Sequence, residues 1–209
     1  MSTVLGRITA IVPNHTSTDA FLGDAVRSLR SQTVPIEQIV IINDTESRGP
    51  AWARNAAARC AQGGWLLLLD ADDTIAPEFV AECERAAGAD TVAIIPSASP
   101  LTNVIDLDNY LPYCALIRRD VWHALGGHQE PSARGCGLCD WDFWIRLWRW
   151  QEEHRKLGHY PLQIGYIPPT MFTHRERADS MSKWSMTHFA EMRADMWSKY
   201  GISEVTDAH

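Results

Sequence analysis

Long apolar runs are missing from this 209-residue chain, because no stretch reaches the roughly 18 consecutive apolar residues that a membrane-spanning helix needs. The N-terminus also lacks the basic region, the apolar region and the small-residue cleavage site of a secretory signal. A net charge of -7 argues against unaided binding to nucleic acid or to an anionic membrane, although a local basic groove stays open. These absences predict a cytoplasmic protein.

Cysteine is scarce, and the five residues are Cys60, Cys83, Cys114, Cys136 and Cys139. An odd number of cysteines, mostly in apolar surroundings, favours reduced thiols over a disulfide framework. Cys136 and Cys139 form a Cys-x-x-Cys, and His123 and His128 lie upstream. The histidines do not have the spacing of a zinc finger, so a structural zinc site is only a minor alternative.

The most informative stretch that is present covers residues 65–77, where an apolar run ends at three carboxylates. Such a run is typical of a strand buried on both faces, and ligand sites form at the carboxyl ends of these strands. Asp70, Asp72 and Asp73 are hard oxygen donors that suit Mg²⁺ or Mn²⁺ bound together with phosphates. The alternative is that Asp72 or Asp73 caps the helix predicted after Pro77, which explains one aspartate but not three.

Strands and helices alternate through the first half of the chain. Apolar runs predict strands at residues 8–13, 38–43, 65–69 and 91–96, and helical spacing predicts helices at 20–32, 50–60 and 77–87. This alternation indicates an α/β fold with a mostly parallel sheet, whose ligand-binding loops lie at the carboxyl ends of the strands.

The second half of the chain is less regular. We expect a strand at residues 112–117, a short helix at 120–125, a helix that begins near Asp140, late strands at 160–167 and 171–173, and an amphipathic helix at 183–200. Trp141, Trp144 and Trp148 share one face of the helix near Asp140, and such a stripe is more often core than a platform for sugar stacking. The last helix is expected to pack on the domain or on a second copy of the chain.

Four sequence blocks occur in a fairly specific order. They are Ile-Val-Pro at 11–13, Ile-Val-Ile-Ile-Asn-Asp at 39–44, Ala-Arg-Asn at 53–55 followed by Gly64 and Leu-Asp-Ala-Asp-Asp at 69–73, and finally Leu-Ile-Arg-Arg at 116–119 with Gly126-Gly127 and Asp-Trp-Asp at 140–142. Over residues 8–182 this order resembles that of family 2 glycosyltransferases, which have the GT-A fold.

The resemblance implies one GT-A domain over residues 1–209, with a Rossmann-like, mostly parallel sheet flanked by helices and a small acceptor-side half. Residues 1–96 would bind the nucleotide sugar, 97–182 would hold the acceptor and the catalytic base, and 183–209 would form the C-terminal helix and tail. The implied activity is a metal-dependent, inverting transfer of a hexosyl-type sugar. The donor would be a nucleotide-diphosphate sugar, with a UDP-sugar favoured, and the metal Mn²⁺ or Mg²⁺.

The resemblance also implies site residues. Pro13, Asp44, Arg54, Asp70 and Asp72 would bind the donor, with Asp44 at the base and Asp70 near the ribose. Asp72 of the Asp-x-Asp motif would ligate the metal, with His174 as a further metal or phosphate contact. Asp140 would be the general base, and Trp141 and Asp142 would lie on the acceptor side. Apart from the resemblance, Arg175 and Arg48 are candidates for bidentate contacts with the diphosphate, and nothing in the sequence selects between them.

This sequence departs from the family pattern at three places, which bear mainly on the donor's base. Cys139 stands where the family often has a glutamate before the base aspartate, Asn43 replaces the first of a usual aspartate pair, and Asn14-His15-Thr16 replaces a common Tyr-Asn. For Asp140 and Asp142, a helix-capping role is the simpler alternative.

Two other functions stay open at this stage. A nucleotidyltransferase of similar architecture would need a glycine-rich phosphate loop after the first strand, and residues 13–19 contain no glycine. A non-catalytic module that binds sugars or nucleotides would need no general base. The acceptor is undetermined, since a glycan, a lipid carrier, a protein side chain or a modified nucleic-acid base would need the same donor half.

Overall fold

The structure is a computed structural model that describes residues 5–97, 113–129, 138–158, 162–177 and 187–202. The strands are β1 (Ile8–Asn14), β2 (Gln38–Asn43), β3 (Trp65–Leu68), β4 (Thr74–Ile75), β5 (Thr91–Pro96), β6 (Ala115–Arg118), β7 (Gln163–Ile167) and β8 (Phe172–Thr173). The helices are α1 (Asp19–Arg30), α2 (Pro50–Cys60), α3 (Phe79–Ala86), α4 (Arg119–Ala124), α5 (Cys139–Lys156) and α7 (Phe189–Tyr200), with short 3-10 turns at Thr16–Thr18 and Pro169–Met171.

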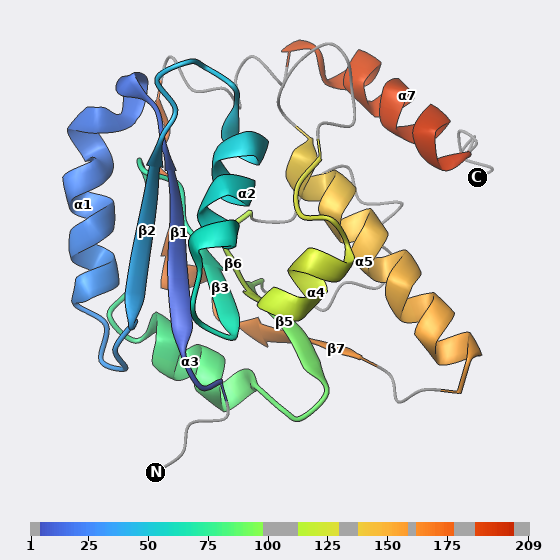
Figure 1. The fold of residues 1–209 in the computed structure, drawn as a ribbon, viewed down its shortest axis with the longest axis horizontal. Coiled ribbons are helices and arrows are strands. Elements are labelled where there is room, and N and C mark those ends of the chain that lie inside the picture. The colour runs from blue at the N-terminus through green and yellow to red at the C-terminus, as the bar shows by residue number, and fades with distance from the viewer. Residues whose placement is uncertain (1–4, 98–112, 130–137, 159–161, 178–186, 203–209) are drawn as a thin grey trace.

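Six strands form one central sheet in the order β2-β1-β3-β6-β5-β7, as Figure 1 shows in part. Strand β1 runs parallel to β2 and β3, and β5 runs parallel to β7. Strand β6 runs antiparallel to both of its neighbours, β3 and β5. The predicted mostly parallel sheet is therefore confirmed.

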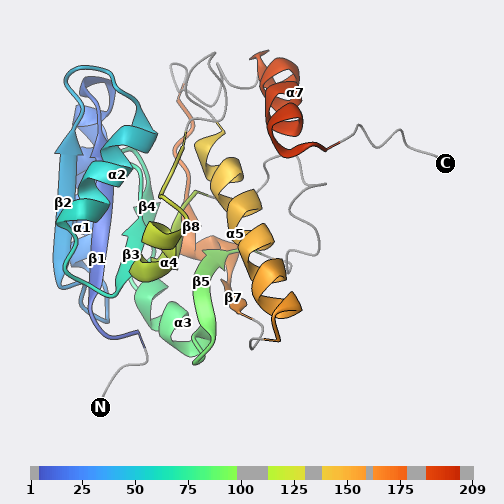
Figure 2. The ribbon, with the colours of Figure 1, turned by 45° about the vertical axis from the view of Figure 1, so that its right-hand side comes forward.

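Each face of the sheet is covered by its own set of helices. Leu66 and Leu68 pack in the cluster that contains buried residues of α2, α4, α5 and α7. Leu67 and Leu69 pack in the other cluster, with residues of α1 and α3. Figure 2 shows α4 and α5 on the side of the sheet that α7 also approaches. Because successive side chains of β3 enter opposite cores, an all-apolar run is what this strand requires.

The tryptophans of α5 are core residues. Trp141 and Trp144 are buried, and the ring of Trp141 stacks on that of Phe189 in α7 with 6.3 Å between centroids. Met192 and Met196 of α7 are buried in the same cluster. The C-terminal helix thus packs on the domain, and the indole of Trp141 is not available as a platform for a sugar.

A second, two-stranded sheet pairs β4 with β8 and was not predicted in this form. Thr74 lies opposite Thr173 and Ile75 opposite Phe172, in antiparallel register. Two-residue strands are too short to show any periodicity in a sequence. This pairing matters because it carries residues 174–177 next to the carboxylates at 70–73.

Of the five cysteines, the four in the described ranges, Cys60, Cys83, Cys114 and Cys139, are not in disulfides, while Cys136 lies outside these ranges. Within these ranges no helix combines the length and the apolar character needed to cross a membrane.

Candidate active site

The three aspartates after β3 occupy one tight turn, closed by a hydrogen bond from Asp73 N to Asp70 O of 3.2 Å. β1 and β6 flank β3 on its two sides, so the turn lies beyond the centre of the sheet rather than at its rim. The predicted placement of a carboxylate cluster at the carboxyl end of a buried strand is therefore what the structure has.

Asp70 is paired with a buried arginine of α2. Arg54 Nη2 donates to Asp70 Oδ1 at 2.6 Å, and the Arg54 side chain is only 4% exposed. Burial opposes the charge of Arg54, but Asp70 and other nearby anions outweigh this effect and raise the pKa of the guanidinium. Arg54 is thus a fixed positive charge beside the aspartates, and its partner is the residue expected near the ribose.

Arg54 also reaches toward the start of α5. Its Nη1 lies 3.6 Å from Cys139 Sγ and 3.4 Å from His128 Nδ1. The guanidinium lies over the ring of Tyr113, 5.4 Å from the centroid. Arg54 therefore connects the donor-side aspartate Asp70 with the helix that carries Asp140.

Asp140 lies in the first turn of α5, where its Oδ1 accepts a hydrogen bond of 2.9 Å from Trp141 N. Burial raises the pKa of Asp140 to about 6, while the positive charge of Arg54 opposes this rise. A carboxyl group with such a pKa is ionised at neutral pH and basic enough to accept a proton, as a general base must be.

Asp72 and Asp73 bind the segment that follows β8. Arg177 Nη1 donates to Asp72 Oδ2 at 3.0 Å, and Arg175 N donates to Asp73 Oδ1 at 2.6 Å. His174 Nδ1 lies 3.4 Å from Asp73 Oδ2. The predicted metal contact His174 is therefore at the carboxylate cluster, where its imidazole faces Asp73.

Burial raises the pKa values of both carboxyl groups, and that of Asp73 reaches about 7. The negative charge of Asp70 contributes to both shifts, and for Asp73 the charge of Asp72 contributes as well. Carboxylates held this close together repel one another when ionised, so a cation bound beside them would stabilise their charged forms.

The possible metal ligands at this turn suit a divalent ion that also binds oxygens of a phosphate group. In the described ranges no group of three or more His, Cys, Asp or Glu side chains is arranged to hold a metal by itself. Mg²⁺-type sites use one or two carboxylates and complete their coordination with substrate phosphates and water. Asp72, with Asp70 and His174 close to it, fits a site of this kind.

A cavity of about 250 Å³ opens at the ends of β1 and β2, lined by Asn14, His15, Thr16, Asp19, Leu22, Asn43, Asp44 and Thr45. Asp44 accepts backbone hydrogen bonds from Arg48 N at 2.9 Å and Gly49 N at 2.7 Å. Burial disfavours the Asp44 carboxylate, but these hydrogen bonds outweigh burial and lower its pKa. Pro13, in β1, lies opposite Ile42 of β2 in the central sheet, and it is not one of the residues that line this cavity.

Asp142 lies in the interior of the protein, between α5 and α7. Its side chain is fully buried and binds Arg146 of the same helix, together with Lys199 Nζ and Tyr200 Oη of α7, each at 2.6 Å from Asp142 Oδ1. A carboxylate enclosed by these donors is committed to joining α5 and α7. We therefore assign Asp142, like Trp141, to packing rather than to contact with an acceptor.

Sequence analysis missed two residues of this site. Arg177 is the ion-pair partner of Asp72, and its only signal in the sequence is the alternation of basic residues after Thr173. The ring of Tyr113 lies near both Arg54 and His174, and no motif marked this residue. Arg48 was a candidate for the diphosphate, but its side chain binds Glu46 and lies over the ring of Trp52.

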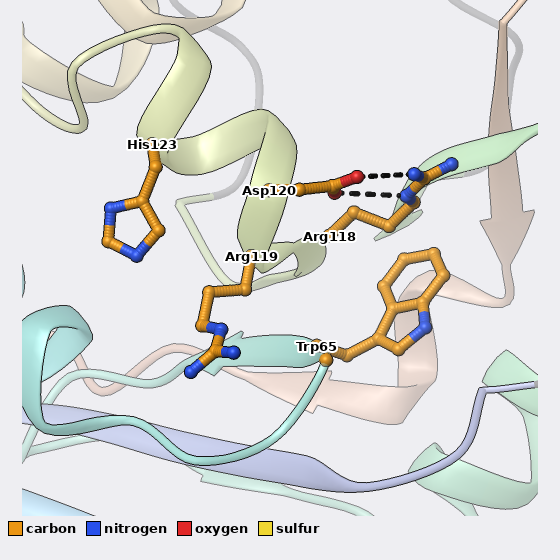
Figure 3. Close-up of a pocket in the computed structure, with 6 residues that line it drawn as sticks. Trp65, Arg118, Arg119, Asp120 and His123 are labelled. Carbon is orange, nitrogen blue, oxygen red and sulfur yellow. Dashed lines mark hydrogen bonds and ion pairs between the residues drawn. The ribbon is translucent and has the colours of Figure 1, made fainter.

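A cavity of about 600 Å³ lies at the other end of β3 (Figure 3), lined by Gly64, Trp65, Arg118, Arg119, Asp120 and His123. Arg118 faces Asp120, while Arg119 and His123 extend from the same helix in another direction. Trp65 begins β3 and the aspartates follow its end, so the Arg-Arg pair of the fourth sequence block lies away from them.

Comparisons with known proteins agree with this architecture. A family model described as "Glycosyl transferase family 2" matches residues 45–118. The succinoglycan biosynthesis protein ExoO of Rhizobium meliloti (strain 1021) is 40% identical over 45 residues, which are 22% of this chain and 13% of that protein.

Three solved structures are similar over nearly the whole chain. A mannosyltransferase from Pyrobaculum calidifontis in complex with GDP-Man and Mn²⁺ has a TM-score of 0.65 and 17% identity, covering 95% of this chain and 65% of that one. TarS 1–349 of S. aureus in complex with UDP-GlcNAc has a TM-score of 0.61 and 14% identity, covering 97% and 69%. Glucosyl-3-phosphoglycerate synthase from Mycobacterium tuberculosis, with Mn²⁺, UDP-Glc and phosphoglyceric acid, has a TM-score of 0.60 and 14% identity, covering 96% and 82%.

At these identities the structural similarity concerns the fold, and the chain spans a small part of the curated relative and about two thirds of the mannosyltransferase. The matched segment includes Arg54 and the three aspartates, whereas Asp140 and His174 lie outside it. The chain therefore has the GT-A fold and, over residues 45–118, the sequence pattern of glycosyl transferase family 2, which confirms the resemblance seen in its motifs.

Proposed function

We propose that the chain is a metal-dependent inverting glycosyltransferase that moves a sugar from a nucleotide-diphosphate donor to an acceptor hydroxyl. The observation that supports this proposal is that one buried arginine connects two carboxylates: Arg54 binds Asp70 directly at 2.6 Å, and it lies 3.6 Å from Cys139 Sγ, the residue before Asp140, whose pKa is about 6. A donor-binding carboxylate and a carboxyl group able to accept a proton therefore both interact with the same buried cation.

The donor would lie across the carboxyl ends of β1, β2 and β3. The cavity of about 250 Å³ beside Asp44 would take the nucleobase. A carboxylate offers about four lone-pair positions, so Asp44 can accept an N–H of a base besides its two backbone hydrogen bonds. Structural neighbours that carry UDP-GlcNAc, UDP-Glc or GDP-Man support a nucleotide sugar, and we favour a UDP-sugar.

The diphosphate would lie over the turn at residues 70–73. Asp72 would hold the metal with Asp70 and His174 nearby, and Mn²⁺ or Mg²⁺ is supported by structural neighbours that contain these ions. When bound, such an ion acts as a Lewis acid toward the negative charge of the leaving diphosphate. Arg175 remains a candidate for further contact with the phosphates.

Asp140 would take the proton of the acceptor hydroxyl while that oxygen attacks the anomeric carbon and the nucleoside diphosphate departs. A single displacement of this kind inverts the anomeric centre. The charge of Arg54 favours the ionised form of Asp140, because it opposes the effect of burial on the pKa of that carboxyl group. The proposed reaction therefore needs Asp140 as a base and Asp72 as a metal ligand. It also needs Arg54, which binds Asp70 and favours the ionised form of Asp140.

A donor screen tests this proposal. Each nucleotide sugar is incubated with Mn²⁺, and the release of nucleoside diphosphate is compared for the wild type, Asp72→Ala and Asp140→Asn. We expect one donor to be turned over by the wild type, Asp72→Ala to lose metal-dependent binding, and Asp140→Asn to bind the donor with turnover reduced by roughly 10²- to 10⁴-fold. A non-catalytic binding module would instead show donor binding that Asp140→Asn leaves unchanged and no turnover in any protein.

A further inference from the structure

Arg177 lies at the carboxylate that the proposed function assigns to the metal. Its guanidinium binds Asp72 Oδ2 through Nη1 at 3.0 Å, and the two side chains are 8% and 16% exposed. In the protein without metal, the guanidinium of Arg177 therefore balances the negative charge of the Asp72 carboxylate.

The segment that carries Arg177 is fixed in place by several other contacts. Arg175 donates its backbone N–H to Asp73 Oδ1 at 2.6 Å, its Nε to Asp72 O at 2.9 Å and its Nη2 to Asp24 Oδ2 at 3.0 Å. Both guanidinium groups also lie over the ring of Phe21, with distances to the centroid of 4.7 Å for Arg175 and 5.4 Å for Arg177. These contacts reach from α1 to the aspartate turn and hold Arg177 beside Asp72.

We propose that Arg177 is a substitute cation: it neutralises Asp72 when no metal is bound, and it leaves this carboxylate when the metal binds. The inference rests on the proposed function, because it takes Asp72 as the metal ligand. A divalent ion binds a carboxylate oxygen at about 2.0–2.1 Å, whereas the guanidinium nitrogen lies 3.0 Å from the same carboxylate. Two cations at one partly buried carboxylate repel each other, so the two occupants compete.

Competition has a reciprocal consequence. Metal binding weakens the hold of Asp72 on Arg177, and by linkage the Arg177 contact weakens the affinity for the metal by the same factor. Without nucleotide, the wild type should therefore bind the metal weakly, because Arg177 competes with the metal for Asp72. The phosphates of a donor supply the additional oxygen ligands that shift the balance toward the metal.

Arg175, two residues before Arg177, provides a matched control. Arg175→Met removes the same charge from the same segment, but its side chain binds the main-chain oxygen of Asp72 and the carboxylate of Asp24 rather than the Asp72 carboxylate. A general electrostatic effect would change metal affinity similarly in Arg175→Met and Arg177→Met. Direct competition would change it mainly in Arg177→Met.

The experiment measures Mn²⁺ binding by the loss of the free-ion electron paramagnetic resonance signal, first without nucleotide and then with UDP. Without nucleotide we expect Arg177→Met to bind Mn²⁺ about tenfold more tightly than the wild type, within the usual range of coupling between two sites. Arg177→Lys, which keeps a cation without the planar fork, should fall in between. The gain should disappear when Arg177→Met is combined with Asp72→Asn.

The outcomes separate this inference from the proposed function. Equal Mn²⁺ affinity in the wild type and Arg177→Met, with tight binding in the presence of UDP, would overturn the substitute cation and leave Asp72 as a metal ligand. Equal gains in Arg175→Met and Arg177→Met would also overturn it. Failure of every variant to bind Mn²⁺, even with UDP, would overturn the metal site itself. If Arg177→Met does not fold, the comparison of Arg177→Lys with the wild type decides.

Discussion

At the scale of single residues, three adjacent aspartates have three different environments. Asp70 binds a buried guanidinium, Asp72 binds Arg177, and Asp73 accepts the backbone N–H of Arg175 beside His174. The sequence shows only that the three are acidic. Their roles differ because each meets a partner from a different part of the chain.

The pKa of Asp140 predicts how the proposed reaction depends on pH. Burial raises this pKa to about 6, and a general base acts only when it is deprotonated. Turnover should therefore fall as pH decreases through about 6 and should level off above it. The measurement is kcat/KM against pH, which reports the groups of the free enzyme, and a profile that stays flat down to pH 5 would exclude Asp140 as the base.

Arg54 predicts a shift of the same profile. Its positive charge lowers the pKa of Asp140, so Arg54→Met should move the acid limb to higher pH. Arg54→Lys keeps the charge and should shift the limb less. The methionine variant also leaves Asp70 without its partner, which predicts a loss of about 3–5 kcal/mol in the free energy of unfolding. An unchanged acid limb in a folded Arg54→Met protein would contradict the link between Arg54 and Asp140.

At the scale of elements, α7 fixes the position of the helix that carries Asp140. Asp142 lies two residues after Asp140 and binds Lys199 and Tyr200 of α7. Arg146 extends this network to the main-chain oxygens of Leu125 and Gly127, at 2.6 and 2.8 Å. The first turns of α5 are thus held by α7 and by the main chain at residues 125–127, through contacts that do not include Asp140.

Lys199→Met tests this connection. The variant removes one of the cations of a fully buried carboxylate while Arg146 and Tyr200 remain, so we expect a loss of about 1–3 kcal/mol in the free energy of unfolding. Lys156→Met, at the exposed end of α5, is the matched control and should change stability by less than about 0.5 kcal/mol. Urea unfolding measures both, and equal stability of the two variants would mean that the Lys199 contact contributes nothing.

At the scale of the whole molecule, local sequence patterns were enough to predict a strand or helix where the element is long and its burial is uniform. The strands β1, β2, β3 and β5 and the helices α1 and α2 follow the predicted ranges closely, because apolar runs and helical spacing reflect burial directly. The β4–β8 pairing, Arg177 and Tyr113 escaped prediction, because each depends on contacts between distant parts of the chain. Asp142 was assigned to the acceptor side from the motif at 140–142, and its interior position was not predicted because its partners Lys199 and Tyr200 lie 57 and 58 residues away.

The order of strands predicts that the chain unfolds as one unit. β5 belongs to the first 97 residues, but both of its neighbours in the sheet, β6 and β7, come from the second half, and β3 also pairs with β6. A fragment of residues 1–97 would expose the unpaired edges of β3 and β5 and much of both cores, so we expect it to show no cooperative transition. For the whole chain, tryptophan fluorescence and far-ultraviolet circular dichroism should give coincident urea curves. Two separated transitions, or a cooperatively folded fragment, would show that the donor half is a domain of its own and that the shared sheet is not what holds it together.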